Sequence, residues 1–199
     1  MTPRPRVAPL RRDQIIRATI RCLAREGYAN LTMKKLAREA EVRSGILHYY
    51  FPSKRAILLA ALERVMGDLD RRVVRHARGS RDPRERLRAL IGTCLSVAVD
   101  AREFWIVFVE FWGEMMHDRS LLRVNARLYA RFRRVIGELV ASGIRRGQFR
   151  RVDPEEAGAV ILALADGLSL QLTFDPRALT LEQATRLGED AAMRYLAKR

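Results

Sequence analysis

Residues 31–51 have the sequence LTMKKLAREAEVRSGILHYYF, and this stretch decides how the rest of the chain is interpreted. Thr32 suits a helix N-cap, because its hydroxyl can accept a free backbone N–H of the first turn. An apolar face follows at helical spacing: Met33, Leu36, Ala37 and Ala40. The stretch therefore predicts a short helix, a tight turn and a second short helix. We expect Ser44 to cap the second helix and Ile46 and Leu47 to face inward.

Two short helices cannot bury a core alone, and residues 11–28 supply a third amphipathic helix that ends near Gly27. The outward positions of the pair carry residue types that contact phosphates and bases: Lys34, Lys35, Arg38, Arg43, Ser44, His48 and Tyr49. This arrangement predicts a helix-turn-helix, with its second helix in a DNA major groove. The alternative is an ordinary three-helix packing unit.

The same residues resemble the DNA-binding domain of the TetR family of repressors. The matching positions are Thr32, Leu36-Ala37, Ala40, Val42, Gly45-Ile46-Leu47, Tyr49-Tyr50-Phe51, Lys54 and Leu58. Three positions depart from the family pattern: Glu41 replaces the turn glycine, Arg43 a serine and His48 a tyrosine. Glycine tolerates a positive φ and glutamate does not, so Glu41 bears directly on the backbone of the turn.

The predicted DNA-binding residues divide by role. We expect Arg43, Ser44 and Tyr49 to contact bases. We expect phosphate contacts from Thr32, Lys34, His48 and Lys54, and Gly45 completes the predicted DNA-binding set. Residues 1–54 hold 12 Lys or Arg against 4 Asp or Glu, within a chain of net charge +15. A basic head of this kind attracts polyanions, and its binding should weaken with salt.

Composition limits the remaining classes. A hydrophobic share of 48% in 199 residues supports a true core, in one DNA-binding head and one body. Cys22 and Cys94 are expected to be buried free thiols in a reducing cytoplasm. The longest apolar run is around Phe104 to Phe111, and no run is of membrane-spanning length. The Met1 to Pro9 segment lacks the apolar core of a signal peptide.

Start and stop residues predict an all-α chain of about nine helices. Pro52-Ser53 opens a long fourth helix to about Arg78, which joins the head to the body. Later helix starts are expected at Asp82-Pro83, Asp100, Asp118, Asp153-Pro154 and Thr180. We therefore expect a basic arm and DNA-binding domain over 1–54, and a helical ligand-binding and dimerisation domain over 55–199.

The sixth predicted helix is apolar nearly all round and rich in aromatic side chains. Aromatic faces beside a carboxylate suit a quaternary ammonium ion, although an ordinary core helix with glutamates at its edge has the same pattern. The body also resembles the betaine-inhibitor branch of the TetR family, through Phe111-Trp112, Met116-His117 and Asp166-Gly167-Leu168. That resemblance implies a pocket for a cationic or apolar small molecule. The expected ligand-binding residues are Trp105, Phe108, Glu110, Phe111, Trp112, Met115, Asp166 and Leu170.

The last two predicted helices carry small residues among large apolar ones, and they resemble the four-helix dimer interface of the family. The expected interface residues are Gly158, Ile161, Leu162, Ala165, Leu168, Leu187, Ala191 and Tyr195. A two-fold dimer contacts a palindromic operator. The alternative is that these faces pack within one chain.

The sequence contains no residue pattern that indicates an enzyme. Glu110, Glu114 and His117 are at most half of a di-iron site, and GxSxG, Walker A, GxGxxG and CxxC patterns are absent from the sequence. We expect no metal, cofactor or membrane partner. The expected function is a ligand-responsive regulator, a repressor by resemblance, that binds its operator as a homodimer and leaves it when a small molecule binds. The alternative is a metal-free all-α enzyme, or a helical binding protein whose basic head binds no DNA.

Overall fold

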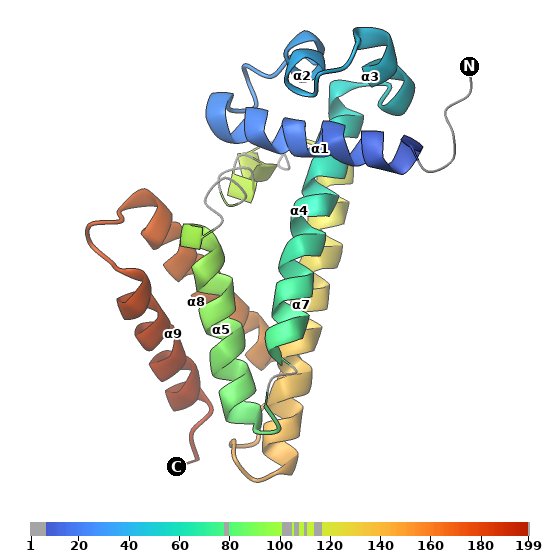
Figure 1. Ribbon diagram of the computed structural model, residues 1–199. Helices are drawn as coiled ribbons and strands as arrows, with labels where there is room; N and C mark the ends of the chain where they lie inside the picture. The colour runs from blue at the N-terminus through green and yellow to red at the C-terminus, as the bar shows by residue number, and fades with distance from the viewer. Residues whose placement is uncertain are drawn as a thin grey trace. The chain divides into compact units, whose positions relative to one another are not determined.

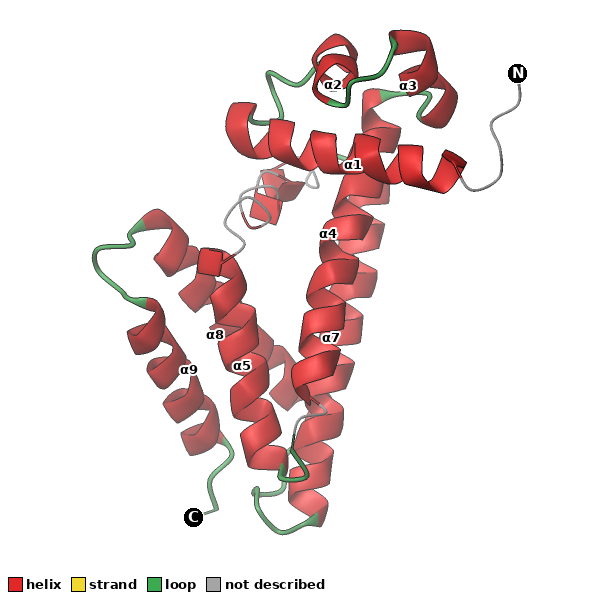
Figure 2. Ribbon diagram, in the orientation of Figure 1, coloured by secondary structure: helices red, strands yellow, loops and turns green. Residues whose placement is uncertain are grey.

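The computed structural model describes residues 7–77, 80–100, 105, 108–109, 111–113 and 117–198, and these residues contain helices and loops but no strand (Figures 1 and 2). The helices are α1 (Val7–Glu26), α2 (Met33–Glu39), α3 (Ser44–Tyr50), α4 (Lys54–Ala77), α5 (Pro83–Asp100), α7 (Arg119–Arg145), α8 (Pro154–Phe174) and α9 (Leu181–Tyr195). Between α5 and α7, Trp105, Phe108, Val109 and 111–113 are helical, and the rest of the predicted sixth helix lies outside the described residues. The all-α prediction is confirmed.

The chain forms two compact units. The head unit contains the described residues of 1–67 and 103–122, and the body unit contains those of 68–102 and 123–199. Helices α4 and α7 contribute residues to both units. The units are defined by packing and do not coincide with the division at residue 54, which stays a proposal about function.

The core of the head unit forms where α1 meets the two short helices and the start of α4. Its fully buried side chains include Ile15, Leu23, Leu36, Leu47 and Ile57. Thr19 is also buried, and its hydroxyl donates to the Ile15 carbonyl at 2.9 Å, so this hydroxyl is paired. Each seven-residue helix buries only a narrow stripe, so neither is stable alone: α2 packs against α1, and α3 packs against α2.

The core of the body unit is built by α5, α8 and α9, which pack against one another. Gly188 of α9 permits close approach, because a Cβ there would lie 3.1 Å from Ile91 and 3.2 Å from Leu168. The predicted starts of the last two helices are confirmed. Asp153 accepts from the backbone N–H of Glu155 at 2.8 Å, and a Thr180–Gln183 capping box opens α9.

Helix α8 changes one expectation about apolar segments. At 21 residues it is long and apolar enough to cross a membrane by length and composition, which corrects the expectation that no apolar run is of membrane-spanning length. A core helix of a soluble protein passes the same test, and α8 packs against α5 and α9. We therefore interpret α8 as a core helix and not as a membrane span.

Candidate DNA-binding surface and effector site

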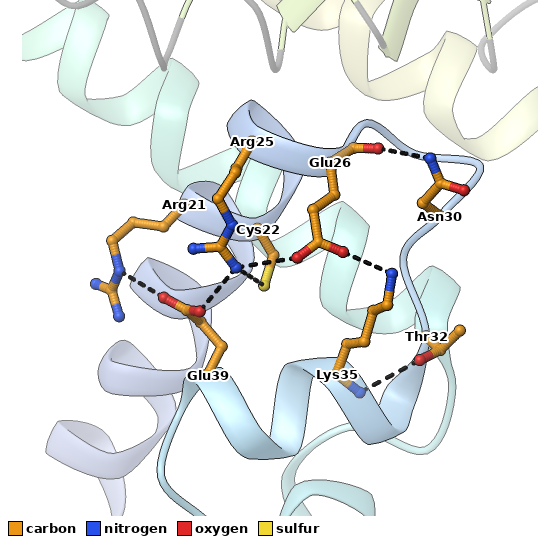
Figure 3. A network of polar contacts seen from close by, with 8 residues as sticks. All are labelled: Arg21, Cys22, Arg25, Glu26, Asn30, Thr32, Lys35 and Glu39. Carbon is orange, nitrogen blue, oxygen red and sulfur yellow. Dashed lines mark hydrogen bonds and ion pairs between the residues drawn. The ribbon is translucent and has the colours of Figure 1, made fainter.

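An ion-pair network fastens α2 to the end of α1 (Figure 3). Glu39 pairs with Arg21 at 3.1 Å and with Arg25 at 3.0 Å, and Glu26 pairs with Arg25 at 3.0 Å and with Lys35 at 2.6 Å. Hydrogen bonds from Arg25 lower the pKa of Glu39, and hydrogen bonds from Lys35 and Arg25 lower the pKa of Glu26. The pairs are exposed or half-buried and each is weak by itself, but together they set how α2 lies against α1.

The predicted cap of α2 is confirmed. The Thr32 hydroxyl accepts the backbone N–H of Lys35 at 3.2 Å, as Figure 3 shows. Just before it, the Asn30 side-chain amide donates to the Glu26 carbonyl at 3.0 Å and closes the loop that leaves α1. These local bonds fix where α2 begins.

The turn between α2 and α3 keeps the backbone of a glycine turn without the glycine. Glu41 has φ 53°, and it is the only non-glycine with positive φ among the described residues. The Val42 N–H donates to the Ala37 carbonyl at 2.9 Å, and the Gln14 side chain donates to the Ala40 carbonyl at 2.8 Å. Neighbouring bonds therefore hold Glu41 in a conformation that costs about 1–2 kcal/mol for an L-residue.

Helix α3 begins differently from the prediction. Arg43 is the N-cap, with an extended backbone (φ −70°, ψ 146°), and Ser44 is already the first helical residue. No side chain caps this helix, because a guanidinium has no acceptor atom. Leu47 is fully buried as expected, but Ile46 is exposed, since so short a helix turns only one stripe inward.

The outward face of α3 is uncovered by the described residues. Ser44, Gly45, His48 and Tyr49 are all exposed, and helical spacing places them on one side. Tyr49 is 70% exposed, and its ring meets Tyr50 edge-on with the centroids 5.1 Å apart. A Cβ at Gly45 would meet nothing within 4 Å. Arg43, also exposed, stands beside this face.

Of the predicted phosphate contacts, some are exposed and one, Lys54, already has a partner within the chain. Thr32 and Lys34 are exposed, and Lys34 forms no ion pair with another described residue. Lys54 is engaged, because its ammonium donates to the Tyr28 carbonyl at 2.8 Å and lies 4.0 Å from the centre of the Tyr28 ring. Ser53 accepts from the Ala56 N–H at 3.2 Å, which confirms it as the cap of α4.

A second ion pair, which the sequence did not suggest, joins the start of α4 to the start of α7 within the head unit. Asp118 accepts from Arg55 Nε at 2.6 Å and from its Nη2 at 2.8 Å. It also caps α7 by accepting the Ser120 N–H at 2.8 Å. The Arg55 hydrogen bonds, with further ones from Ser120, hold the pKa of Asp118 well below its usual range.

The described part of the aromatic segment is packed in the head unit. Trp105, Phe108 and Phe111 are buried, and Trp112 is half-buried. Ring centroids lie 5.4 Å apart for Trp105 and Phe108, and 5.3 Å apart for Phe108 and Trp112. The Trp105 indole N–H is buried with no acceptor among the described residues. Glu110 and Met115, the other two predicted contacts in this segment, lie outside the described residues.

Asp166 and Leu170, the remaining predicted ligand contacts, lie on α8 in the body unit, and both are half-buried. The Tyr129 hydroxyl donates to Asp166 Oδ2 at 2.8 Å. Burial raises the pKa of Asp166 to about 6, although the hydrogen bond from Tyr129 acts in the opposite direction. Burial also raises the pKa of Tyr129, and the Asp166 charge adds to the effect.

Most of the expected dimer contacts are buried inside one chain: Gly158, Ile161, Leu162, Ala165 and Leu168. A Cβ at Gly158 would collide with the Arg133 carbonyl of α7, so this glycine serves packing within the monomer. Tyr195 is half-buried, and its carbonyl accepts from Arg150 Nε at 2.7 Å. Leu187 and Ala191 are exposed and remain available to a partner.

The opposite face of α8 exposes apolar side chains. Ala159 and Ala163 are exposed, Val160 is 47% exposed and Phe174 is 70% exposed. The sequence did not distinguish this stripe from the buried one, because both sides of α8 are apolar.

No group of three or more potential metal ligands lies together within the described ranges. His117 is exposed, and Glu110 and Glu114 lie outside those ranges. Cys22 is buried and Cys94 half-buried, both as free thiols, and burial raises the pKa of Cys94 to about 12.

Two functional candidates were missed from the sequence, Tyr129 and Arg55. Their partners are 37 and 63 residues away, and local periodicity carries no information over such separations. One signal was present: Asp166 is the only charged residue of α8 after Glu156, and a buried carboxylate needs a partner.

Comparisons with known proteins agree along the whole chain. Residues 15–61 match the model of the bacterial regulatory proteins of the TetR family, and residues 83–197 match the BetI-type transcriptional repressor C-terminal model. The regulator BetI of Ectopseudomonas mendocina is 32% identical, with 94% of each chain covered. BetI 1 of Chromohalobacter salexigens is 29% identical, over 98% of this chain and 95% of its own.

A solved structure shows the same fold. A transcriptional regulator from Saccharomonospora viridis, crystallised in complex with choline, superposes with a TM-score of 0.86 at 29% identity, over 94% of this chain and 98% of its own. The matched head model covers the helix-turn-helix and the start of α4, and the matched C-terminal model covers α5 to α9. The chain is therefore a transcriptional regulator and not an enzyme, and it belongs to the TetR family with a BetI-type C-terminal domain.

Proposed function

We propose that the protein is a dimeric repressor that binds a two-fold symmetric operator through α3 of each subunit and leaves it when a small organic cation binds the C-terminal domain. The observation that carries the proposal is the uncovered face of α3, formed by Ser44, Gly45, His48 and Tyr49 beside Arg43. A short helix that packs against α2 and is free in front is the geometry that enters a major groove.

In this proposal the side chains divide between bases and phosphates. Arg43, Ser44 and Tyr49 contact bases, and an arginine bridging the two acceptors of a guanine discriminates by about 1–3 kcal/mol. Thr32, Lys34, His48 and Lys54 contact the phosphate backbone, which sets affinity and salt dependence. Gly45 lets the helix backbone approach the DNA, since no side chain stands there.

We place the dimer interface on the exposed face of α8 and on α9. It comprises Ala159, Val160, Ala163, Phe174, Leu187 and Ala191. A contiguous apolar stripe of this kind is stabilised when a second copy covers it. A two-fold dimer then presents two α3 helices to half-sites about one helical turn apart.

The proposed effector is cationic and the proposed location is the cytoplasm. The choline complex of the Saccharomonospora relative supports the ligand class. Effector binding acts on DNA by favouring one arrangement of the two heads, with α4 as the moving element, and a coupling of about 1–3 kcal/mol would be typical.

The test is a gel shift with DNA from upstream of the protein's own gene, in about 150 mM salt. We expect a shifted band with two protein chains per fragment that competitor DNA of unrelated sequence does not displace, and we expect choline to abolish it. Equal binding to unrelated DNA would contradict the regulator proposal, whereas a specific shift that choline leaves intact would contradict only the effector.

A further inference from the structure

Asp166 is a carboxylate in an environment poorly matched to its charge. It is the only charged residue of α8 between Ala157 and Phe174, and it is half-buried. Among the described residues its hydrogen-bond partner is one neutral hydroxyl, that of Tyr129 at 2.8 Å. A buried charge is costly unless an opposite charge compensates it, and a single neutral hydrogen bond compensates only part of the cost.

The charge has no counter-ion within the described part of the chain. No lysine, arginine or histidine there forms an ion pair with Asp166. The titratable groups that sense it are Tyr129 of α7 and Cys94 of α5, and both of them are neutral at physiological pH. Helix α9 contributes the small Gly188 against Leu168, two residues further along α8. The surroundings therefore supply acceptors and neutral groups but no cation.

A second buried polar group without a hydrogen-bond partner among the described residues lies on the face of α7 that carries Tyr129. Asn125 is one helical turn before Tyr129, and residues four apart share a face of a helix. Its Oδ1 atom is buried and has no hydrogen-bond donor among the described residues. Buried acceptors are normally satisfied, so an unsatisfied one on the face of α7 from which Tyr129 reaches Asp166 indicates a missing donor.

We infer that Asp166 is the counter-ion of a small organic cation, with Asn125 accepting a hydrogen bond from a donor group of that cation. Tyr129 is a positioning residue, because its hydroxyl holds the carboxylate in place. A metal ion is the wrong occupant, since one carboxylate falls short of the six or more oxygen ligands of calcium. The inference rests on the proposed function, because the cation would be its effector.

One consequence is that binding of the cation and protonation of Asp166 oppose each other. A cation favours the ionised carboxylate, and the pKa of Asp166 is about 6 without it. The cation must therefore displace a proton at pH 5 but not at pH 8. Affinity should be constant above pH 7 and fall about tenfold for each pH unit below the pKa.

The experiment measures ligand binding directly, by thermal shift and calorimetry on the DNA-free dimer. The probes are choline, betaine aldehyde and tetramethylammonium, each up to about 10 mM, with 3,3-dimethylbutan-1-ol as the uncharged analogue of choline. We expect at least one cation to raise the melting temperature of the wild type, and the uncharged alcohol to leave it unchanged. Asp166→Asn should weaken that binding at least roughly 30-fold while the protein stays folded.

The matched control is Glu138→Gln. Glu138 is an exposed carboxylate on α7 that lines a groove of about 340 Å³ with Arg133, Pro154 and Glu155, so it is the rival acidic site in the body unit. We expect Glu138→Gln to bind the cation as the wild type does. Loss of binding in this variant with full binding in Asp166→Asn would overturn the inference.

Tyr129→Phe separates positioning from packing. It keeps the ring and removes the hydroxyl that lowers the pKa of Asp166. The pH at which cation binding begins to fail should therefore rise, whereas a purely structural role would leave the pH profile in place.

Two further results would overturn the inference: no stabilisation of the wild type by any of the three cations, or equal binding by Asp166→Asn. Failure of the proposed function is distinguishable, because ligand-free Asp166→Asn should still shift operator DNA. If the wild type binds the cation but no DNA, the regulator proposal fails and the cation site stands.

Discussion

At the scale of single residues, the most informative position is Glu41, where the side chain and the backbone disagree. A glutamate at φ 53° is strained, and glycine relieves that strain at the expense of a more flexible unfolded chain. We expect Glu41→Gly to raise the free energy of unfolding by roughly 1 kcal/mol and Glu41→Val to lower it by more. Urea denaturation measures both. Stability unchanged in the two variants would mean that the turn is relaxed.

Asp166 carries the second residue-scale prediction, which concerns pH. Its pKa is raised from 3.8 to about 6 in the folded state, so between these values the folded protein binds a proton that the unfolded chain does not. The contribution of Asp166 to the stability of the ligand-free protein should therefore become more favourable as pH falls from 7 toward 4. Asp166→Asn should remove this dependence and add roughly 1–2 kcal/mol at pH 7, after allowance for solvent around a half-buried group. Thermal melts across that pH range, with Glu138→Gln as control, decide the sign.

Residue roles were predictable where the physics is local. Thr32 and Ser53 cap helices through bonds that span three residues, and both were expected from sequence. Ser44 was misplaced by one position, because cap and first helical residue differ by a single pair of backbone angles. The Tyr129–Asp166 bond was out of reach, because it depends on how α7 lies against α8.

At the scale of elements, the pair of Arg55 and Asp118 links the first turn of α4 to the first turn of α7. The pKa of Asp118 is lowered, so the pair's contribution to stability is present above the unfolded pKa near 4 and is lost as pH falls below it. We expect Asp118→Ala to destabilise more than Arg55→Ala, because only the former also removes the cap of α7. A double-mutant cycle from urea denaturation should show a positive coupling that shrinks in high salt.

The control is Arg151→Ala, which removes an exposed arginine from the body unit. If its effect equals that of Arg55→Ala, the coupling between α4 and α7 is absent.

Most helix starts and ends were predictable because caps, Pro and Gly mark them. The pairing of Arg55 with Asp118 was not predictable in this way, because the two residues are 63 positions apart in the sequence.

At the scale of the whole molecule, the proposed dimer makes a sharp prediction about Val160. This residue is 47% exposed on α8, so a charged replacement leaves the interior of the chain intact. We expect Val160→Arg to give a folded monomer by light scattering and to weaken operator binding by two orders of magnitude or more, roughly the contribution of a second half-site.

Leu122→Arg is the matched control, because Leu122 is 50% exposed on α7 outside the proposed interface. The Leu122→Arg variant should stay dimeric. If the Val160→Arg variant is also dimeric, the interface does not lie on this stripe of α8. The residues expected from sequence lie mostly on the buried stripe of α8, whereas the interface proposed here uses the exposed stripe. Periodicity identifies a buried face only where the other face is polar, and on α8 both are apolar.

Charge at this scale was also only partly predictable. The excess of cations in residues 1–54 indicated a nucleic-acid partner. Composition could not show that Arg21, Arg25 and Lys35 form ion pairs with Glu26 and Glu39, whereas Lys34 and Arg43 form none with another described residue.

The central claim is that the exposed face of α3 recognises operator sequence, and its most direct test is fluorescence anisotropy with operator and scrambled DNA over a range of salt. Arg43→Ala should lose about 10-fold or more of the preference for operator, whereas Lys34→Ala should weaken both DNAs alike and reduce the salt slope by about 2 per dimer. If Arg43→Ala keeps the full preference, or if the wild type prefers neither DNA, then α3 does not read the operator and the account is wrong.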